Sequence, residues 1–304
     1  MSFRDLAIAV MSFSQTTVGI LGNFSLLYYY LVLGQNRCTL KSTHLILRHL
    51  IIANSMIILS KSLPQTMTAF GLKHFLNDFG CKILLYFQRV GRGVSIGTTC
   101  LLSIFQTIMI SPMNSCWMDL KVKAPRYVGF STAFCWILYM VVNLIFPMYV
   151  YGKWNSQNMT KKRDLGYCST VGGDKIVDSL YTVLFVFPEV LFSVLIIWGS
   201  SSMVFILYRH KQRAQHIHSS NVSLKSSPES RATHSILVLL CTFVMFFFLS
   251  SILNVCVALF YNPSWWLVNI SALLSVSFPT VSPFVLMNRA STVPRFCLGN
   301  IKIH

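Results

Sequence analysis

The chain has 304 residues, of which 54% are hydrophobic and only 11% are charged, and its formal net charge at pH 7 is +17. This composition is unlike that of a soluble globular protein. In a soluble chain the basic excess would indicate a nucleic-acid partner, but between apolar segments it has to be assigned loop by loop. We therefore expect membrane lipid, and no nucleic acid, as a partner.

Seven apolar stretches fill most of the chain, and each exceeds the roughly 20 residues that a helix needs to cross a bilayer at about 1.5 Å per residue. They run approximately over residues 6–33, 45–70, 83–110, 127–151, 176–208, 235–260 and 265–287. A β-barrel would show short alternating segments instead. The sequence predicts an all-α membrane protein, with one seven-transmembrane-helix bundle as its single domain over residues 1–304.

The loop charges predict the orientation. If the N-terminus is extracellular, the cytoplasmic segments are strongly basic and contain only two acidic residues, Asp119 and Glu229. The segments on the other side carry a more even mixture of charges. Because positive residues collect on the cytoplasmic side, we expect an extracellular N-terminus and a cytoplasmic C-terminus.

Two features on the predicted outer side agree with this orientation. Cys81, at the start of the third span, and Cys168, after the fourth, fall on the same side and can form a disulfide in an oxidising compartment. Asn158 begins the sequon Asn158-Met159-Thr160, which requires luminal exposure for glycosylation. The pair His216 and His218 is too short to predict a zinc site, so we expect no metal and no cofactor.

Ionisable residues inside the spans are the strongest functional signal. They are Lys61, Arg89, Arg92 and Glu189, and such residues usually face a cavity or one another. The chain shows no catalytic constellation, so we do not expect an enzyme. A membrane transporter or channel is an alternative, but the odd number of spans and the lack of a repeat between halves speak against it.

The two cysteines resemble the pair that joins span 3 to the second outer loop in rhodopsin-like G-protein-coupled receptors. Asn23, Trp136, Pro188 and Pro283 match landmark residues of spans 1, 4, 5 and 7. Other motifs of that class are altered. Span 2 has Asn54 for Asp, span 3 ends in Phe105-Gln106-Thr107 instead of Asp-Arg-Tyr, span 6 has Phe247-Phe248-Leu249 for Trp-x-Pro, and span 7 has Ser282-Pro283-Phe284-Val285-Leu286 for Asn-Pro-x-x-Tyr.

These departures form a pattern of their own, and over nearly its whole length the chain resembles the vomeronasal type-1 receptors, a pheromone-receptor family. The central motif is Arg89-Val90-Gly91-Arg92-Gly93-Val94-Ser95-Ile96-Gly97-Thr98-Thr99-Cys100. Further matching segments are 44–47, 53–54, 101–103, 105–106, 111–112, 207–218, 227–233 and 278–284. Bitter-taste receptors share the size and short tails but lack this set, and they remain the nearest alternative.

The resemblance implies a plasma-membrane receptor that has a Cys81–Cys168 disulfide, binds a small pheromone-like molecule and activates a heterotrimeric G protein, of the Gi/o class as in the family. Gln88, Arg89 and Arg92 share neighbouring faces of span 3, about 10–16 Å below Cys81 at helical rise. We expect them, with Lys61 and Glu189, to contact ligand. The alternatives are that Arg89 and Arg92 pair with Glu189 or with backbone carbonyls to hold the bundle together, or that Arg89 reaches toward the outer interface.

At the cytoplasmic side, span 5 runs into a basic segment with Arg209, Lys211 and Arg213. The resemblance implies that this segment and Gln106 contact the G protein, whereas anchoring to anionic lipid would explain the charges without a partner. Because Gln106 replaces the usual Arg, the common ionic restraint on span 3 cannot form in this chain.

Overall fold

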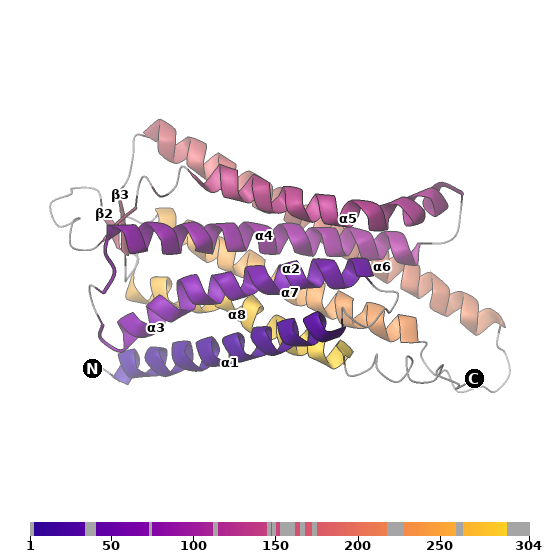
Figure 1. Ribbon diagram of the computed structural model, residues 1–304, viewed down its shortest axis with the longest axis horizontal. Coiled ribbons are helices and arrows are strands. Elements are labelled where there is room, and N and C mark those ends of the chain that lie inside the picture. The colour runs from indigo at the N-terminus through magenta and orange to yellow at the C-terminus, as the bar shows by residue number, and fades with distance from the viewer. Residues whose placement is uncertain are drawn as a thin grey trace.

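The computed structural model covers residues 1–304. It describes residues 3–33, 41–72, 75–111, 115–144, 147, 150–152, 162–164, 168–171, 175–217, 228–259 and 264–290. Within this part the chain is built almost entirely from long helices that lie side by side along a common direction (Figure 1). The helices are α1 (Phe3–Leu33), α2 (Lys41–Ile57), α3 (Leu63–Ala69), α4 (Asp78–Ile110), α5 (Ser115–Val142), α6 (Lys175–Ile217), α7 (Pro228–Leu259) and α8 (Trp265–Ala290).

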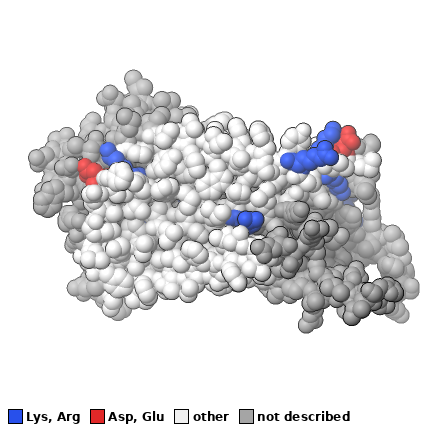
Figure 2. Space-filling view, in the orientation of Figure 1, with Lys and Arg blue, Asp and Glu red and all other residues white. Residues whose placement is uncertain are grey.

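A π-helical turn, η1 (Ile58–Ser62), joins α2 directly to α3, so these three elements form one helical rod and the described residues form seven rods. Six rods are long and apolar enough to cross a membrane, and they include the composite one, Ser42–Ala69. The predicted all-α membrane bundle is confirmed. Charged side chains gather mainly toward the two ends of the visible face, and its broad middle is almost entirely uncharged (Figure 2).

The fourth rod departs from the expected span of residues 127–151. Helix α5 ends at Val142, and Val150–Gly152 form a strand, so the α-helix is shorter than the apolar stretch. Pro147 lies between these elements, and a proline within an α-helix lacks the N–H donor and clashes with the carbonyl four residues earlier. Apolar composition alone therefore did not show where α5 ends and that strand β1 follows it.

Three short strands form an antiparallel sheet that the sequence analysis did not predict. These strands are β1 (Val150–Gly152), β2 (Lys162–Asp164) and β3 (Cys168–Val171), in the order β1-β3-β2. Thr170 of the central strand pairs with Val150 on one side and with Arg163 on the other. The sheet lies at the end of the bundle where α1 begins (Figure 1). We call this end the disulfide end.

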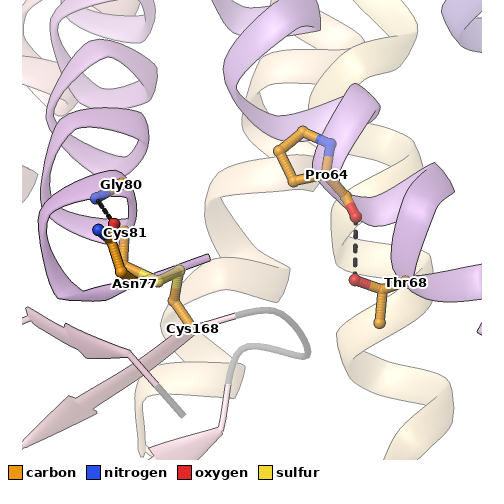
Figure 3. Close-up of a disulfide and its surroundings, with 6 residues drawn as sticks. All are labelled: Pro64, Thr68, Asn77, Gly80, Cys81 and Cys168. Carbon is orange, nitrogen blue, oxygen red and sulfur yellow. Dashed lines mark hydrogen bonds between the residues drawn. A yellow bond between two sulfur atoms is a disulfide. The ribbon is translucent and has the colours of Figure 1, made fainter. Parts of the chain in front are cut away.

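A disulfide between Cys81 and Cys168 fastens the sheet to α4, and both residues are fully buried (Figure 3). The preceding residues fix the start of α4, because the backbone N–H of Gly80 donates a 2.8 Å hydrogen bond to Oδ1 of Asn77, an N-cap. Leu85 packs against the disulfide. A covalent bond between residues 87 positions apart thus ties the loop after α5 to the first turn of α4.

Helix α4 is the centre of the bundle. Most of its residues between Val90 and Thr107 are buried, and it packs against α2, α5 and α6. Polar bonds cross the same core: Asn54 of α2 accepts a 3.0 Å hydrogen bond from Ser95 of α4 and donates one of 3.0 Å to Ser282 of α8. Asn23 of α1 donates to the carbonyl oxygen of Pro279 at 2.9 Å. Four rods are therefore connected by polar side chains whose hydrogen bonds lipid could not provide.

Two glycines allow α4 and α5 to approach closely. A Cβ atom on Gly93 would overlap the ring of Tyr139, and one on Gly97 would overlap Sγ of Cys135. Both partners are buried, so neither side chain can move into open space. Small residues at a helix interface are how membrane helices gain van der Waals contact.

Replacing Gly93 with Ala should therefore destabilise the bundle by about 1–3 kcal/mol, the usual cost of overpacking a core. Gly129→Ala is the matched control, because its Cβ would meet only Leu45 Cδ2 at 3.9 Å, an ordinary contact. Thermal unfolding of the two purified variants should show a lower midpoint for Gly93→Ala alone. Equal midpoints would contradict the proposed role of this contact.

Candidate functional site

A cluster of buried polar side chains crosses the bundle interior on the disulfide-end side of its middle. Its central residue, Arg92, lies eleven residues after Cys81 on α4, or about 16 Å along the helix. The other members come from η1, α6, α7 and α8. We call the set the Arg92 cluster; it consists of Lys61, Arg92, Glu189, Ser250, Ser251 and Ser275.

The guanidinium of Arg92 joins three helices. Its Nε donates to Oε1 of Glu189 on α6 at 2.8 Å, an ion pair whose side chains are only 12% and 11% exposed. Its Nη1 and Nη2 donate to the hydroxyls of Ser250 and Ser251 on α7, at 3.1 and 2.7 Å. The guanidinium carbon also lies 4.2 Å from the ring centre of Phe247. Arg92 thus donates hydrogen bonds through its guanidinium nitrogens and also makes a cation–π contact through the flat face of the guanidinium.

Glu189 is equally well satisfied. Its second carboxylate oxygen, Oε2, accepts a 3.0 Å hydrogen bond from Ser251, so Arg92, Glu189 and Ser251 close a ring of contacts among α4, α6 and α7. Such closure is what a buried ion pair needs to offset the loss of hydration. The pairing of Arg92 with Glu189 matches the expectation that these residues hold the bundle together.

Lys61 enters the cluster from the opposite side, from the π-helical turn η1. Its Nζ donates to the hydroxyl of Ser275 on α8 at 2.8 Å, and that hydroxyl also contacts the hydroxyl of Ser250 at 2.9 Å. Lys61 and Arg92 are therefore linked through Ser275 and Ser250. Five helical rods meet in one continuous set of hydrogen bonds.

A small cavity opens beside these residues, with a volume of about 20 Å³. That volume holds about one water molecule. Polar residues and aromatic rings share the wall, which consists of Ile57, Lys61, Gln88, Arg92, Ser95, Phe243, Phe246, Phe247, Ser250, Leu274, Ser275, Phe278 and Pro279. The cavity therefore combines a cationic side with an apolar side.

The structure brings together most of the residues that were expected to contact ligand. Lys61, Gln88 and Arg92 line the cavity, and Glu189 is linked to it through Arg92. Arg89 is half-buried on α4 and is not one of the described residues that line the cavity.

The sequence analysis missed the serines. Ser250, Ser251 and Ser275 interrupt apolar stretches, and Ser250 and Ser251 are followed by Asn254, which donates to Ser250 at 3.3 Å. Polar residues on one side of an otherwise apolar membrane helix indicate an inward face. That signal was present in the sequence, but it does not reveal which helix the serines contact.

The candidate G-protein contacts lie toward the other end. Gln106 is buried, and its amide donates to the hydroxyl of Thr43 on α2 at 3.4 Å. Arg209 is exposed on α6, with its guanidinium carbon 5.5 Å from the ring centre of Phe205. Lys211 and Arg213 lie on the same helix, which continues to Ile217.

The structure does not describe two of these side chains, those of Lys211 and Arg213. The predicted glycosylation site, Asn158, lies outside the described residues.

Comparisons with known proteins identify the family. The model of the vomeronasal organ pheromone receptor family matches residues 6–299. Human vomeronasal type-1 receptor 4 is 56% identical over 299 residues, which cover 98% of this chain and 99% of that protein. Human vomeronasal type-1 receptor 2 is 56% identical over 93% of this chain and 72% of its own length. Mouse vomeronasal type-1 receptor 45 is 31% identical over 94% of this chain and 90% of its own length.

The family is one of receptors rather than enzymes, and its members are multi-pass proteins of the plasma membrane that have a ligand and a G protein as partners. The helical rods, their apolar surfaces and the disulfide agree with that architecture. The chain belongs to the vomeronasal type-1 receptor family of G-protein-coupled receptors.

Proposed function

We propose that residues 1–304 form a single chemosensory receptor domain. It binds a small pheromone-like molecule beside the Arg92 cluster and activates a heterotrimeric G protein of the Gi/o class at the opposite end. The observation that carries this proposal is the cavity itself, where buried cations and aromatic rings line one space between η1, α4, α7 and α8. Such a mixed wall suits a ligand that has one polar group and an apolar body.

Ligand binding requires α7 to shift. The cavity of about 20 Å³ is far smaller than the roughly 300–1,000 Å³ of ordinary ligand pockets. Widening it displaces Phe243, Phe246 or Phe247, all on α7, and Phe247 stacks on Arg92. The same helix carries the serines that bond Arg92. An agonist therefore favours the arrangement in which α7 has moved away, which shifts an existing equilibrium.

The orientation follows from the loop charges and the disulfide. We propose that the disulfide end is extracellular, since disulfides persist in oxidising compartments, and that the basic extension of α6 is cytoplasmic. Arg209, Lys211 and Arg213 then lie where a G protein approaches. Gln106 bonds Thr43 through neutral groups, so activation at this end breaks no ion pair at that position.

The orientation can be tested on intact cells. Asn158→Gln should increase the electrophoretic mobility of the protein as much as enzymatic deglycosylation does. Asn221→Gln, in a second sequon between spans 5 and 6 that we expect to be cytoplasmic, should leave the mobility unchanged.

Cys81→Ser and Cys168→Ser should each lower the fraction of mature protein at the cell surface. The double variant should lower it little further, because the same single bond is lost in every case. Antibody access to a C-terminal tag without permeabilisation would refute the orientation.

Breaking the ion pair should release α7. Glu189→Gln leaves the Arg92 charge buried without a carboxylate, which should cost about 3–5 kcal/mol of stability and raise ligand-independent G-protein activation. Replacing both Arg92 and Glu189 with Met should cost less than the two single changes combined. The measurements are thermal unfolding and nucleotide exchange at equal surface amounts. Wild-type values for Glu189→Gln would show that the pair restrains nothing.

Neutralising the α6 extension should weaken coupling. With Arg209, Lys211 and Arg213 changed to Ala, we expect maximal G-protein activation to fall several-fold while ligand binding stays intact, because the electrostatic contact is lost. Changing Lys161, Lys162 and Arg163 to Ala removes the same charge from the other side and serves as the control. Equal activation by the two triple variants would contradict the assigned contact.

A further inference from the structure

We propose that Arg48 of α2 and Arg126 of α5 bind the phosphate of an anionic phospholipid on the outer surface of the bundle, toward the end opposite the disulfide end. We call these two residues the arginine pair. Its site is separate from the Arg92 cluster and goes beyond the proposed receptor function, because its occupant is a component of the membrane.

A short seam between α2 and α5 sets the position of the arginine pair. Nε1 of Trp136 donates a 3.2 Å hydrogen bond to Nδ1 of His49, and a Cβ on Gly129 would lie 3.9 Å from Cδ2 of Leu45. Residue numbers rise in the same direction in both helices between these two contacts. The helices therefore run parallel along the seam, as they do in Figure 1.

Helical geometry places both arginines on the same side of this seam. Arg126 comes three residues before Gly129, and Arg48 comes three residues after Leu45. At about 3.6 residues per turn, each is rotated about 60° from its seam residue, and the two rotations have opposite senses. Opposite rotations on two parallel helices that face one another turn the side chains toward the same side. The two Cα atoms are about 9 Å apart along the helix axes, a separation that two long side chains can close.

Arg48 lies close to the depth of the lipid phosphates. The span Ser42–Ala69 has 28 residues, so its length is about 42 Å, against about 30 Å for the hydrocarbon core. Arg48 follows Ser42 by about 9 Å along the helix, which is only about 3 Å inside the hydrocarbon for a centred span. From there an arginine side chain reaches the interface and takes its charge with it.

The arginine pair lacks a counter-ion within the described part of the chain. The ion pairs within 4.0 Å among the described residues join Arg92 to Glu189 and Lys123 to Asp119. No hydrogen bond joins either guanidinium of the arginine pair to a described residue. Arginine stays protonated in proteins, so its charge at this depth is best balanced by an anion from outside the chain. A phosphate suits this task, because its oxygens match the paired N–H donors of a guanidinium.

The surrounding charges favour a headgroup with a net negative charge. Lys121 and Lys123 precede Arg126 on α5, and Asp119 is the one acidic residue in the sequence of that helix. Figure 2 shows Lys and Arg side chains gathered at this end of the visible face. A zwitterionic headgroup would bring a cation of its own into this basic region, whereas an anionic headgroup would not.

Exposed apolar side chains continue from both arginines toward the membrane interior. Ile52 and Phe130 follow Arg48 and Arg126 by four residues, so they lie on the same faces one turn deeper. They are 37% and 72% exposed. A lipid held at the arginine pair therefore lays its acyl chains along these residues, which a soluble phosphate compound could not do.

Native mass spectrometry of the full-length receptor tests the site. The receptor in detergent micelles is titrated with dioleoyl phosphatidylglycerol or dioleoyl phosphatidylcholine, which have the same acyl chains and differ in headgroup charge. We expect the first phosphatidylglycerol to bind at least about tenfold more tightly than the first phosphatidylcholine. The double variant Arg48→Met with Arg126→Met should reduce this preference to about twofold or less.

Two further double variants make the test specific. Arg48→Lys with Arg126→Lys keeps the charge but loses the paired donors, so it should show an intermediate preference, and it keeps the test valid if the Met variant does not fold. Arg209→Met with Arg213→Met removes the same charge from the extension of α6 and should leave the preference unchanged. The inference is overturned if the wild type shows no preference, if the Met variant of the arginine pair keeps it, or if both Met variants lose it equally.

A G protein is the competing partner for basic residues at this end of the bundle. If the Met variant of the arginine pair keeps its lipid preference and instead lowers nucleotide exchange in nanodiscs of phosphatidylcholine, the arginines contact the G protein and the lipid site is overturned. Loss of the preference with unchanged exchange in these nanodiscs supports the lipid site and leaves the proposed receptor function untouched.

Discussion

Hydrocarbon offers no hydrogen-bond partner, and this constraint explains where the polar side chains of the bundle lie. Many hydroxyls bond the carbonyl one turn back in their own helix, as Thr16, Thr99 and Thr132 do. The larger polar groups bond across helices instead. Asn54 connects α2 to α4 and α8, and Arg92 connects α4 to α6 and α7. The polar contacts between helices therefore show which rods pack against one another.

Helix α4 contributes to each of these connections, and its two faces do so by different means. Toward α5 it presents Gly93 and Gly97, where close approach leaves no space for a side chain. Toward α6 and α7 it presents Arg92, whose guanidinium bonds Glu189, Ser250 and Ser251. Shape fixes one interface and charge fixes the other. The interface fixed by charge can rearrange by exchanging partners, whereas the interface fixed by shape has no alternative packing without a gap.

Sequence reasoning identified the features that depend on composition or on single residues. The apolar stretches predicted the helices, and the altered motifs around Arg92 and Gln106 indicated the family. The rarity of charge inside spans singled out four residues, Lys61, Arg89, Arg92 and Glu189, and of these Arg89 is not among the described residues that line the cavity. The partners were harder to predict. Helices α6, α7 and α8 are apolar on nearly all sides, so single polar residues such as Ser250 and Ser275, rather than a periodic stripe, mark the face that turns inward.

The remaining features arise from tertiary context. The π-helical turn that contains Lys61 departs from the regular helix that the apolar stretch predicted, and the sheet at Cys168 depends on pairing between segments that carry no strong strand pattern. The sequence singled out both Arg92 and Lys61, and the structure shows that Arg92 pairs with Glu189 whereas Lys61 donates to the hydroxyl of Ser275.

The apolar part of α7 contains no Asp, Glu, Lys or Arg between Leu237 and Val257, and it bonds Arg92 only through neutral hydroxyls. This apolar part carries no formal charge on its side chains when it is displaced. The free energy that an electric field supplies is proportional to the charge that moves, about 2.3 kcal/mol per elementary charge for each 100 mV. Displacing the apolar part of α7 therefore moves none of its side-chain charges through the membrane interior, and the membrane voltage does no work on those side chains.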